Sequence, residues 1–226
     1  MFFIFAAMKN LCLEHIVRKP TITVEGKAPL LLLLHGYGSD ENDLFSFASE
    51  LPGKYHIISV RAPMPMQPYG NAWYAISIDP TGIKVSDNEG ARVSRDLIAQ
   101  FIDEAVKAYD LDPFNVTLLG FSQGTILSYG VALTYPEKIK NVIGLSGYIN
   151  EDIIDLKSNA AYAHLNIYNS HGTVDQVIPI DAARKTPAYL EKLGIVSSLS
   201  EFPVGHGVHP TNFYELKEWL EKIPQK

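Results

Sequence analysis

Short apolar runs alternate with longer, mixed stretches along most of the chain. The runs have the length of strands, and predicted strands lie at 11–24, 29–34, 55–60, 115–119, 142–145, 165–169 and 196–202. Helices are predicted at 43–51, 91–109, 125–134, 181–193 (irregular near Pro187) and 210–223, and the apolar residues of 91–109, Val93 included, recur at helical spacing. Strands that alternate with helices predict an α/β fold, a mostly parallel sheet with helices on both faces. Function in such folds lies at the carboxyl ends of the strands.

One stretch falls outside this alternation. Residues 63–79 are irregular and rich in proline, and they carry a dense set of large apolar and aromatic side chains: Met64, Met66, Tyr69, Trp73 and Tyr74. This set is either a wall that binds substrate or part of the core, and the sequence leaves both open. The polar stretch 79–90 that follows has no assigned role.

Length and composition narrow the class of protein. A chain of 226 residues, 46% hydrophobic and without a linker or repeat, fits one domain, which we expect over 11–226. The net charge of −6 argues against a nucleic acid or an anionic membrane as partner. Cys12 is the one cysteine, which excludes an intrachain disulfide and makes a reducing, cytoplasmic compartment the default expectation.

The first residues, Met1 to Met8, are apolar. A secretory signal carries its positive charge before its apolar region, whereas Lys9 follows it here. The run is also too short to span a bilayer, so no stable membrane insertion is expected. We expect residues 1–10 to be a disordered extension, with Met8 as an alternative start; a short signal or lipoprotein leader is the other interpretation.

Residues 120–124 read Gly-Phe-Ser-Gln-Gly between a predicted strand and a predicted helix. Gly-x-Ser-x-Gly in this setting is typical of a nucleophile elbow, a tight and strained turn that lifts the serine Oγ above the sheet. The glycines leave room where a Cβ would clash, and the helix N-terminus favours developing negative charge. The pattern predicts Ser122 as a nucleophile; an ordinary glycine-rich turn is the alternative.

A serine nucleophile needs a base that takes its proton and an acid that holds the base. Asp175 lies in the loop after the strand at 165–169, and His206 lies between the last predicted strand and the last helix. Both loops are at the carboxyl ends of strands. Asp181 competes for the acid role but precedes a helix, which suits an N-cap. His209 competes for the base but adjoins the last helix, which suits a capping role.

A third element follows the strand at 29–34, where residues 35–38 read His-Gly-Tyr-Gly. Glycines in such a loop let backbone N–H groups turn toward a substrate oxygen. An oxyanion hole built from this loop and from the residue after the nucleophile would use the backbone N–H groups of Tyr37 and Gln123. The alternative is a tight turn with no catalytic role.

These motifs together resemble the phospholipase/carboxylesterase group of α/β-hydrolases, which includes acyl-protein thioesterases, lysophospholipases and small bacterial carboxylesterases. The resemblance covers about 29–220 and rests on 35–38, 120–124, His171-Gly172 with Asp175 and Pro179, and Gly205-His206, with 61–63 and 71–74 as substrate-side segments. It implies an α/β-hydrolase fold with little or no lid, hydrolysis without a cofactor or metal, and a Ser122–Asp175–His206 triad. A homodimer is a family expectation only. Thr125 departs from the family, which usually has another glycine there, so packing behind the elbow is expected to differ.

We therefore expect a serine carboxylesterase that hydrolyses short to medium acyl esters through an acyl-enzyme, with a small-molecule ester or thioester as its partner. An acyl-protein thioesterase or a lysophospholipase is the first rival, since the triad is shared and only the acyl pocket differs. A non-catalytic ligand-binding module on a hydrolase fold is the second rival, against which the intact Ser, Asp and His argue.

Overall fold

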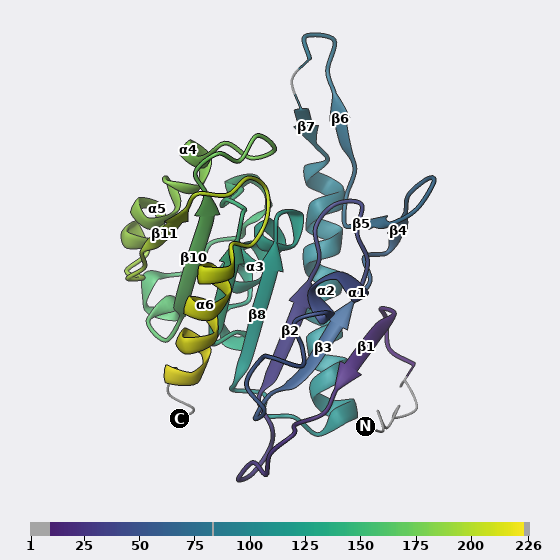
Figure 1. The fold of residues 1–226 in the computed structure, drawn as a ribbon, viewed down its shortest axis with the longest axis vertical. Helices are drawn as coiled ribbons and strands as arrows, with labels where there is room; N and C mark the ends of the chain where they lie inside the picture. Colours follow the sequence, from purple (N-terminus) through teal and green to yellow (C-terminus); the bar gives the residue numbers. More distant parts are fainter. Residues whose placement is uncertain (1–9, 83, 224–226) are drawn as a thin grey trace.

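The computed structural model describes residues 10–82 and 84–223 (Figure 1). Residues 1–9, most of the predicted N-terminal extension, lie outside this range. Within the described residues a seven-stranded sheet has the order β1-β3-β2-β8-β9-β10-β11. The strands are β1 His15–Arg18, β2 Leu30–Leu34, β3 His56–Val60, β8 Val116–Phe121, β9 Asn141–Leu145, β10 Asn166–Gly172 and β11 Leu199–Phe202. Only β1 is antiparallel to its neighbour in this sheet, so the predicted mostly parallel sheet is confirmed.

The sheet is covered by helices on both faces because its strands are apolar on both faces. Alternate residues of a strand point to opposite sides. Leu30, Leu32 and Leu34 pack with α2 (Asn88–Tyr109) and α3 (Gln123–Thr134). Leu31 and Leu33 pack on the other side with α1 (Asn42–Phe45) and α6 (Pro210–Lys222). The remaining helical elements are α4 Ile180–Ala183, α5 Thr186–Lys192 and the 3₁₀ turns η1 Pro136–Lys138, η2 Glu151–Ile153 and η3 Asn159–Tyr162.

The helix predictions hold in type and shift at their ends. The helix expected at 43–51 stops at Phe45 and continues as turns. The helix expected from 91 begins at Asn88, since the side chain of Asp87 accepts a hydrogen bond from the Gly90 amide at 3.0 Å and caps it. The expected helix at 181–193 divides into α4 and α5 next to Pro187. No helix of the described residues is long and apolar enough to cross a bilayer.

Two small hairpins lie between residues 64 and 86, in the segment expected to be irregular (63–79) and the polar stretch that follows it (79–90). β4 (Met64–Pro65) pairs with β5 (Asn71–Ala72), and β6 (Ile76–Ile78) pairs with β7 (Lys84–Ser86). Strands of two or three residues are too short to show an alternating pattern, which explains why the sequence did not indicate them. In Figure 1 the β6–β7 hairpin projects beyond the carboxyl ends of the central strands.

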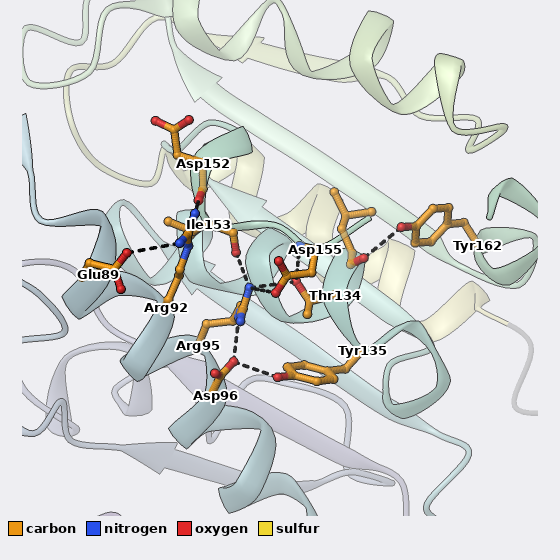
Figure 2. A network of polar contacts seen from close by, with 11 residues as sticks. Glu89, Arg92, Arg95, Asp96, Thr134, Tyr135, Asp152, Ile153, Asp155 and Tyr162 are labelled. Carbon is orange, nitrogen blue, oxygen red and sulfur yellow. Dashed lines mark hydrogen bonds and ion pairs between the residues drawn. The ribbon is translucent and has the colours of Figure 1, made fainter. Parts of the chain in front are cut away.

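The apolar stripe predicted for α2 was wrong at one position. Val93 is 67% exposed, whereas the side chain of Arg95 is buried. Arg95 donates to the carbonyl of Ile153 at 2.6 Å and forms ion pairs with Asp96 and Asp155 at 2.7 and 2.9 Å (Figure 2). This Arg95 network fastens α2 to the turn η2. A guanidinium is therefore buried at a position that the predicted apolar stripe did not include.

Candidate active site

The nucleophile elbow forms where the sequence predicted it, between β8 and α3. Ser122 has φ 53° and ψ −114°, a backbone conformation that L residues adopt only when the surroundings enforce it. The two glycines allow the chains to approach: a Cβ on Gly120 would lie 2.5 Å from the Gly124 carbonyl carbon, and one on Gly124 would lie 2.0 Å from the oxygen of Leu34. The Ser122 amide donates to Leu145 at 2.9 Å and anchors the turn to β9.

Thr125, the departure from the family pattern, fastens the same turn. Its hydroxyl lies 2.7 Å from the carbonyls of Gly120 and Leu145 and accepts from the Leu145 amide at 3.0 Å. Two glycines make room for it, because a Cβ on Gly144 or Gly147 would come within 3.0 Å of the Thr125 side chain. Behind the elbow, the Thr125 hydroxyl therefore adds hydrogen bonds to β8 and β9.

The structure brings Ser122, His206 and Asp175 together from three separate loops. His206 lies between β11 and α6, with its Nε2 2.9 Å from the Ser122 Oγ and its Nδ1 2.7 Å from the Asp175 Oδ2. Its ring packs against Phe121, the centroids 4.9 Å apart. The His206 side chain keeps partial solvent exposure, whereas that of Asp175 is fully buried. The imidazole is therefore partly open to solvent, and the carboxylate is not.

The surroundings of Asp175 keep it ionised. Burial alone would raise the pKa of this carboxyl group, but hydrogen bonds from His206 and from the backbone amides of Ile178 and Val177 outweigh burial and lower its pKa. The two amides donate to Oδ1 at 2.8 and 3.0 Å, which leaves Oδ2 for His206. An ionised Asp175 requires the proton of a neutral His206 on Nδ1, so Nε2 is free to accept from the serine.

His171 stands on the other side of the same carboxylate. Its Nε2 lies 2.8 Å from the carbonyl of Ile178 and 3.3 Å from the Asp175 Oδ2. Both of these atoms are acceptors, so Nε2 carries the proton and donates. His171 thereby holds the loop of Asp175 against β10.

The two competing residues lie elsewhere. His209 is the N-cap of α6, its Nδ1 accepting from the Thr211 amide at 3.2 Å, which is the capping role the sequence indicated. Asp181 is exposed and pairs with Arg184. The prediction that Asp181 is an N-cap was wrong: Pro179 holds that position at α4, and Asp181 lies in the first turn. The prolines and the short length of α4 obscured the start of this helix.

The predicted oxyanion loop lies against the nucleophile. A Cβ on Gly36 would be 3.4 Å from the Cβ of Ser122, so the loop carrying Tyr37 passes beside the serine. Within the described residues, neither the Tyr37 amide nor the Gln123 amide donates to another group. Both N–H groups are therefore available to a substrate oxygen.

The five residues proposed as an acyl wall do not share one surface. Trp73 and Tyr74 are each 1% exposed and belong to the core, so their burial favours the packing alternative. Met64 and Tyr69 are 39% and 79% exposed on the β4–β5 hairpin, with Met66 half-buried between them. The irregular, proline-rich segment made a substrate wall one of the two interpretations for these side chains. At residues 73 and 74, however, the chain runs through the protein interior, beneath the site.

The side chain of Gln123 makes contacts that the sequence analysis did not predict. Its Oε1 accepts from the Trp73 amide and its Nε2 donates to the Tyr74 carbonyl, both at 2.9 Å. No local signal in the sequence indicates a bond between residues 50 positions apart.

No group of three or more His, Cys, Asp or Glu in the described part of the chain could hold a metal ion.

Comparison with known proteins places these features in context. The model of the Phospholipase/Carboxylesterase family matches residues 22–224. Acyl-protein thioesterase 1 of Kluyveromyces lactis is 28% identical and covers 85% of this chain and 89% of its own length. The same-named protein of Emericella nidulans is 25% identical, covering 79% of this chain and 71% of its own.

Solved structures share the fold. A Bacillus cereus carboxylesterase superposes with a TM-score of 0.80 at 21% identity, over 93% of this chain and 94% of that one. A carboxylesterase from Mesorhizobium loti gives the same TM-score and identity over 96% and 98%. At this identity the likeness establishes the α/β-hydrolase fold and no more.

Proposed function

The chain belongs to the phospholipase/carboxylesterase family and is a serine hydrolase that acts on esters, and from this premise we propose that it is a carboxylesterase for short to medium acyl chains that works through Ser122, His206 and Asp175. One observation carries the proposal. The His206 ring is bonded on both sides, 2.9 Å from the Ser122 Oγ and 2.7 Å from the Asp175 Oδ2. This is the arrangement in which an imidazole can take a proton from a serine while a carboxylate stabilises the resulting cation.

The reaction then runs in two halves. The Ser122 Oγ bonds to the acyl carbon as its proton moves to the His206 Nε2, and the charge on the former carbonyl oxygen is held by the Tyr37 and Gln123 amides. The intermediate collapses, the bond to the leaving group breaks, and His206 gives that alcohol or thiol its proton. Water repeats the sequence on the acyl-enzyme: His206 takes its proton, the acid departs, and Ser122 regains a proton.

Acyl selectivity is proposed to lie on the β4–β5 hairpin. This hairpin adjoins the oxyanion loop, since the Gly38 amide donates to Asn71 at 2.9 Å and the Asn71 amide donates to Ser39 at 2.7 Å. Met64, Met66 and Tyr69 on the hairpin supply apolar surface beside the loop. Met64→Ser is expected to change the preference between short and medium acyl esters by about tenfold, since one methylene contact contributes about 1–3 kcal/mol to selectivity. Val93→Ser, which also replaces an exposed apolar side chain by serine but on α2, serves as the control and should leave the profile unchanged.

A thioesterase for lipidated proteins is the second candidate, favoured by the names of the curated relatives. Matched acyl esters and acyl thioesters, from acetyl to palmitoyl, separate the two candidates by kcat/KM. A carboxylesterase gives its highest values on short to medium esters, and a maximum on long-chain thioesters would replace it with the thioesterase. A protein that turns over neither series and takes up no serine-directed organophosphonate would be a ligand-binding module.

A further inference from the structure

The side chain of His35 has a defined tautomer. Its Nε2 lies 3.0 Å from the amide nitrogen of Ala62, and an amide can only donate, so Nε2 must accept. The ring is therefore neutral with its proton on Nδ1. Burial lowers the pKa of His35 and favours this neutral form, although hydrogen bonding and nearby acids oppose the shift. The Nδ1–H group thus donates to the carbonyl of Gly36, at 2.7 Å.

That bond, with a longer one from the Ser39 amide at 3.3 Å, holds the carbonyl of Gly36 and thereby the direction of an oxyanion donor. The carbonyl of Gly36 and the N–H of Tyr37 belong to the same peptide unit, which is planar and trans, so the two groups point in opposite directions. When His35 holds the Gly36 oxygen on one side, the Tyr37 N–H must point to the other. A hydrogen bond to the carbonyl also polarises the peptide, and this makes its N–H a stronger donor.

Trp73 holds the preceding peptide and also reaches the second donor. Its indole N–H donates to the carbonyl of His35 at 3.0 Å, so the carbonyls on both sides of Gly36 are tied to buried rings. The backbone amide of the same residue donates to the side chain of Gln123 at 2.9 Å. Gln123 supplies the other amide of the proposed oxyanion hole. Trp73 therefore connects the two chain segments that must act on one oxygen.

We propose that His35 and Trp73 form an oxyanion latch: both are positioning residues that aim the Tyr37 and Gln123 amides at the developing oxyanion. The inference deepens the proposed function and rests on it. A well-aimed donor in an oxyanion hole contributes a factor of about 10²–10³ to kcat, and a misaligned one contributes less. Loosening the latch should then lower kcat by about tenfold or more and leave KM nearly unchanged, because the donors act on the transition state.

Trp73→Phe tests the latch most directly, since it removes the indole N–H and keeps a buried ring. The measurement is kcat/KM on an acyl ester and on the matching thionoester, whose sulfur is a weaker hydrogen-bond acceptor than oxygen. A loss of folded protein or a damaged triad lowers both rates by the same factor. Misaligned oxyanion donors lower the ester rate more, so the ratio of ester to thionoester rates should fall about tenfold in Trp73→Phe.

Two further variants complete the design. Tyr162→Phe is the control, because it also removes a buried aromatic donor to a backbone carbonyl, that of Leu133 at 2.9 Å, away from the loop; its ratio should equal that of the unaltered protein. His35→Leu should lower the ratio as Trp73→Phe does, and His35→Asn should restore it in part because its amide nitrogen can replace Nδ1. An unchanged ratio in Trp73→Phe would overturn the latch. Unaltered protein that neither hydrolyses the ester nor takes up an organophosphonate on Ser122 would overturn the proposed function, and the latch with it.

Discussion

Two buried polar networks on this chain are built from similar parts and differ in what they can do. The Arg95 network joins α2 to η2, and the network of Ser122, His206 and Asp175 joins three loops at the carboxyl edge of the sheet. Both contain a cationic or imidazole group with a carboxylate and a hydroxyl within hydrogen-bond distance. The burial of polar groups therefore does not by itself distinguish a candidate active site from a network that only stabilises the fold.

The difference lies in which member is buried and which can change its charge. In the Arg95 network the guanidinium is buried and permanently charged, and its carboxylate partners Asp96 and Asp155 are half-exposed or more. In the network of Ser122, His206 and Asp175 the carboxylate is buried, whereas the imidazole side chain keeps 18% of its surface exposed. The strained backbone is also found only on the second, at Ser122. Acid–base catalysis requires a titratable group that a substrate can reach. A network that only stabilises the fold has no such requirement.

The largest expected effect comes from removing the nucleophile. Ser122→Ala should lower kcat by about 10⁶-fold, because members of a triad act as a unit, and the melting temperature should stay close to that of the unaltered protein. Intact-mass analysis with peptide mapping should find one organophosphonate adduct on Ser122 and none in the variant. An adduct on a different serine, with Ser122→Ala still active, would remove this network from the chemistry.

The base is tested by a pair of histidines three positions apart. His206→Ala should lose about 10⁴-fold or more in kcat, since the serine then has no proton acceptor. His209→Ala should keep most of the activity, because the side chain of His209 only caps α6, and it should lose about 1 kcal/mol of stability. Kinetics and thermal unfolding of both variants give the comparison. The reverse pattern would move the base to His209 and contradict the assignment.

The sequence indicated Ser122, His206 and Asp175 because each of them sits in a local pattern. Ser122 is marked by its glycines, and His206 and Asp175 by their places after strands whose apolar runs are plain in the sequence. The contacts that hold these residues have no such mark. Trp73 reaches His35 across 38 positions, and the aromatic ring that looked like a substrate wall is a buried donor.

The Arg95 network escaped the sequence for a related physical reason. The pattern of apolar residues along a helix predicts which of its faces is buried. By that rule an arginine is expected to face solvent and Val93 to face the core. The folded chain offers Arg95 a carbonyl at Ile153 and two carboxylates, which offset the cost of burying its charge. Ile153 and Asp155 belong to a segment distant in sequence, so periodicity within α2 carries no information about them.

A smaller effect on activity is expected from the fastening closest to the nucleophile. Thr125→Val keeps the shape of the side chain but removes the hydroxyl that accepts from Leu145 at 3.0 Å. The elbow should loosen, with kcat about tenfold lower and about 1–3 kcal/mol less stability from the buried hydrogen bonds that are lost with the hydroxyl. Ser128→Ala on the same helix is the control, since its hydroxyl bonds only the Gly124 carbonyl one turn back. Equal kinetics in the two variants would show that the Thr125 hydroxyl does not support the site.

The smallest expected effect on activity belongs to Arg95, and it is the sharpest test of the comparison. Arg95→Met keeps the apolar stem and removes the charge. Asp96 and Asp155 are solvated, so no buried carboxylate is left unpaired, and the main loss is the charge-assisted bond to Ile153, about 1.5–3 kcal/mol. We expect a lower urea midpoint with kcat and KM unchanged at 25 °C.

Arg92→Met one turn earlier is the matched control for Arg95→Met. Arg92 is half-exposed, pairs with Glu89 and also donates to the carbonyl of Asp152 (Figure 2). Because these contacts are exposed to solvent, its loss should cost less than about 1 kcal/mol. A fall in kcat for Arg95→Met, measured where the variant is fully folded, would contradict the distinction between the two networks. The Arg95 network would then influence the geometry of the candidate active site. Such an effect would travel along the chain itself: η2 follows β9 by a few residues, and the carbonyl at the end of β9, that of Leu145, accepts from the Ser122 amide at 2.9 Å.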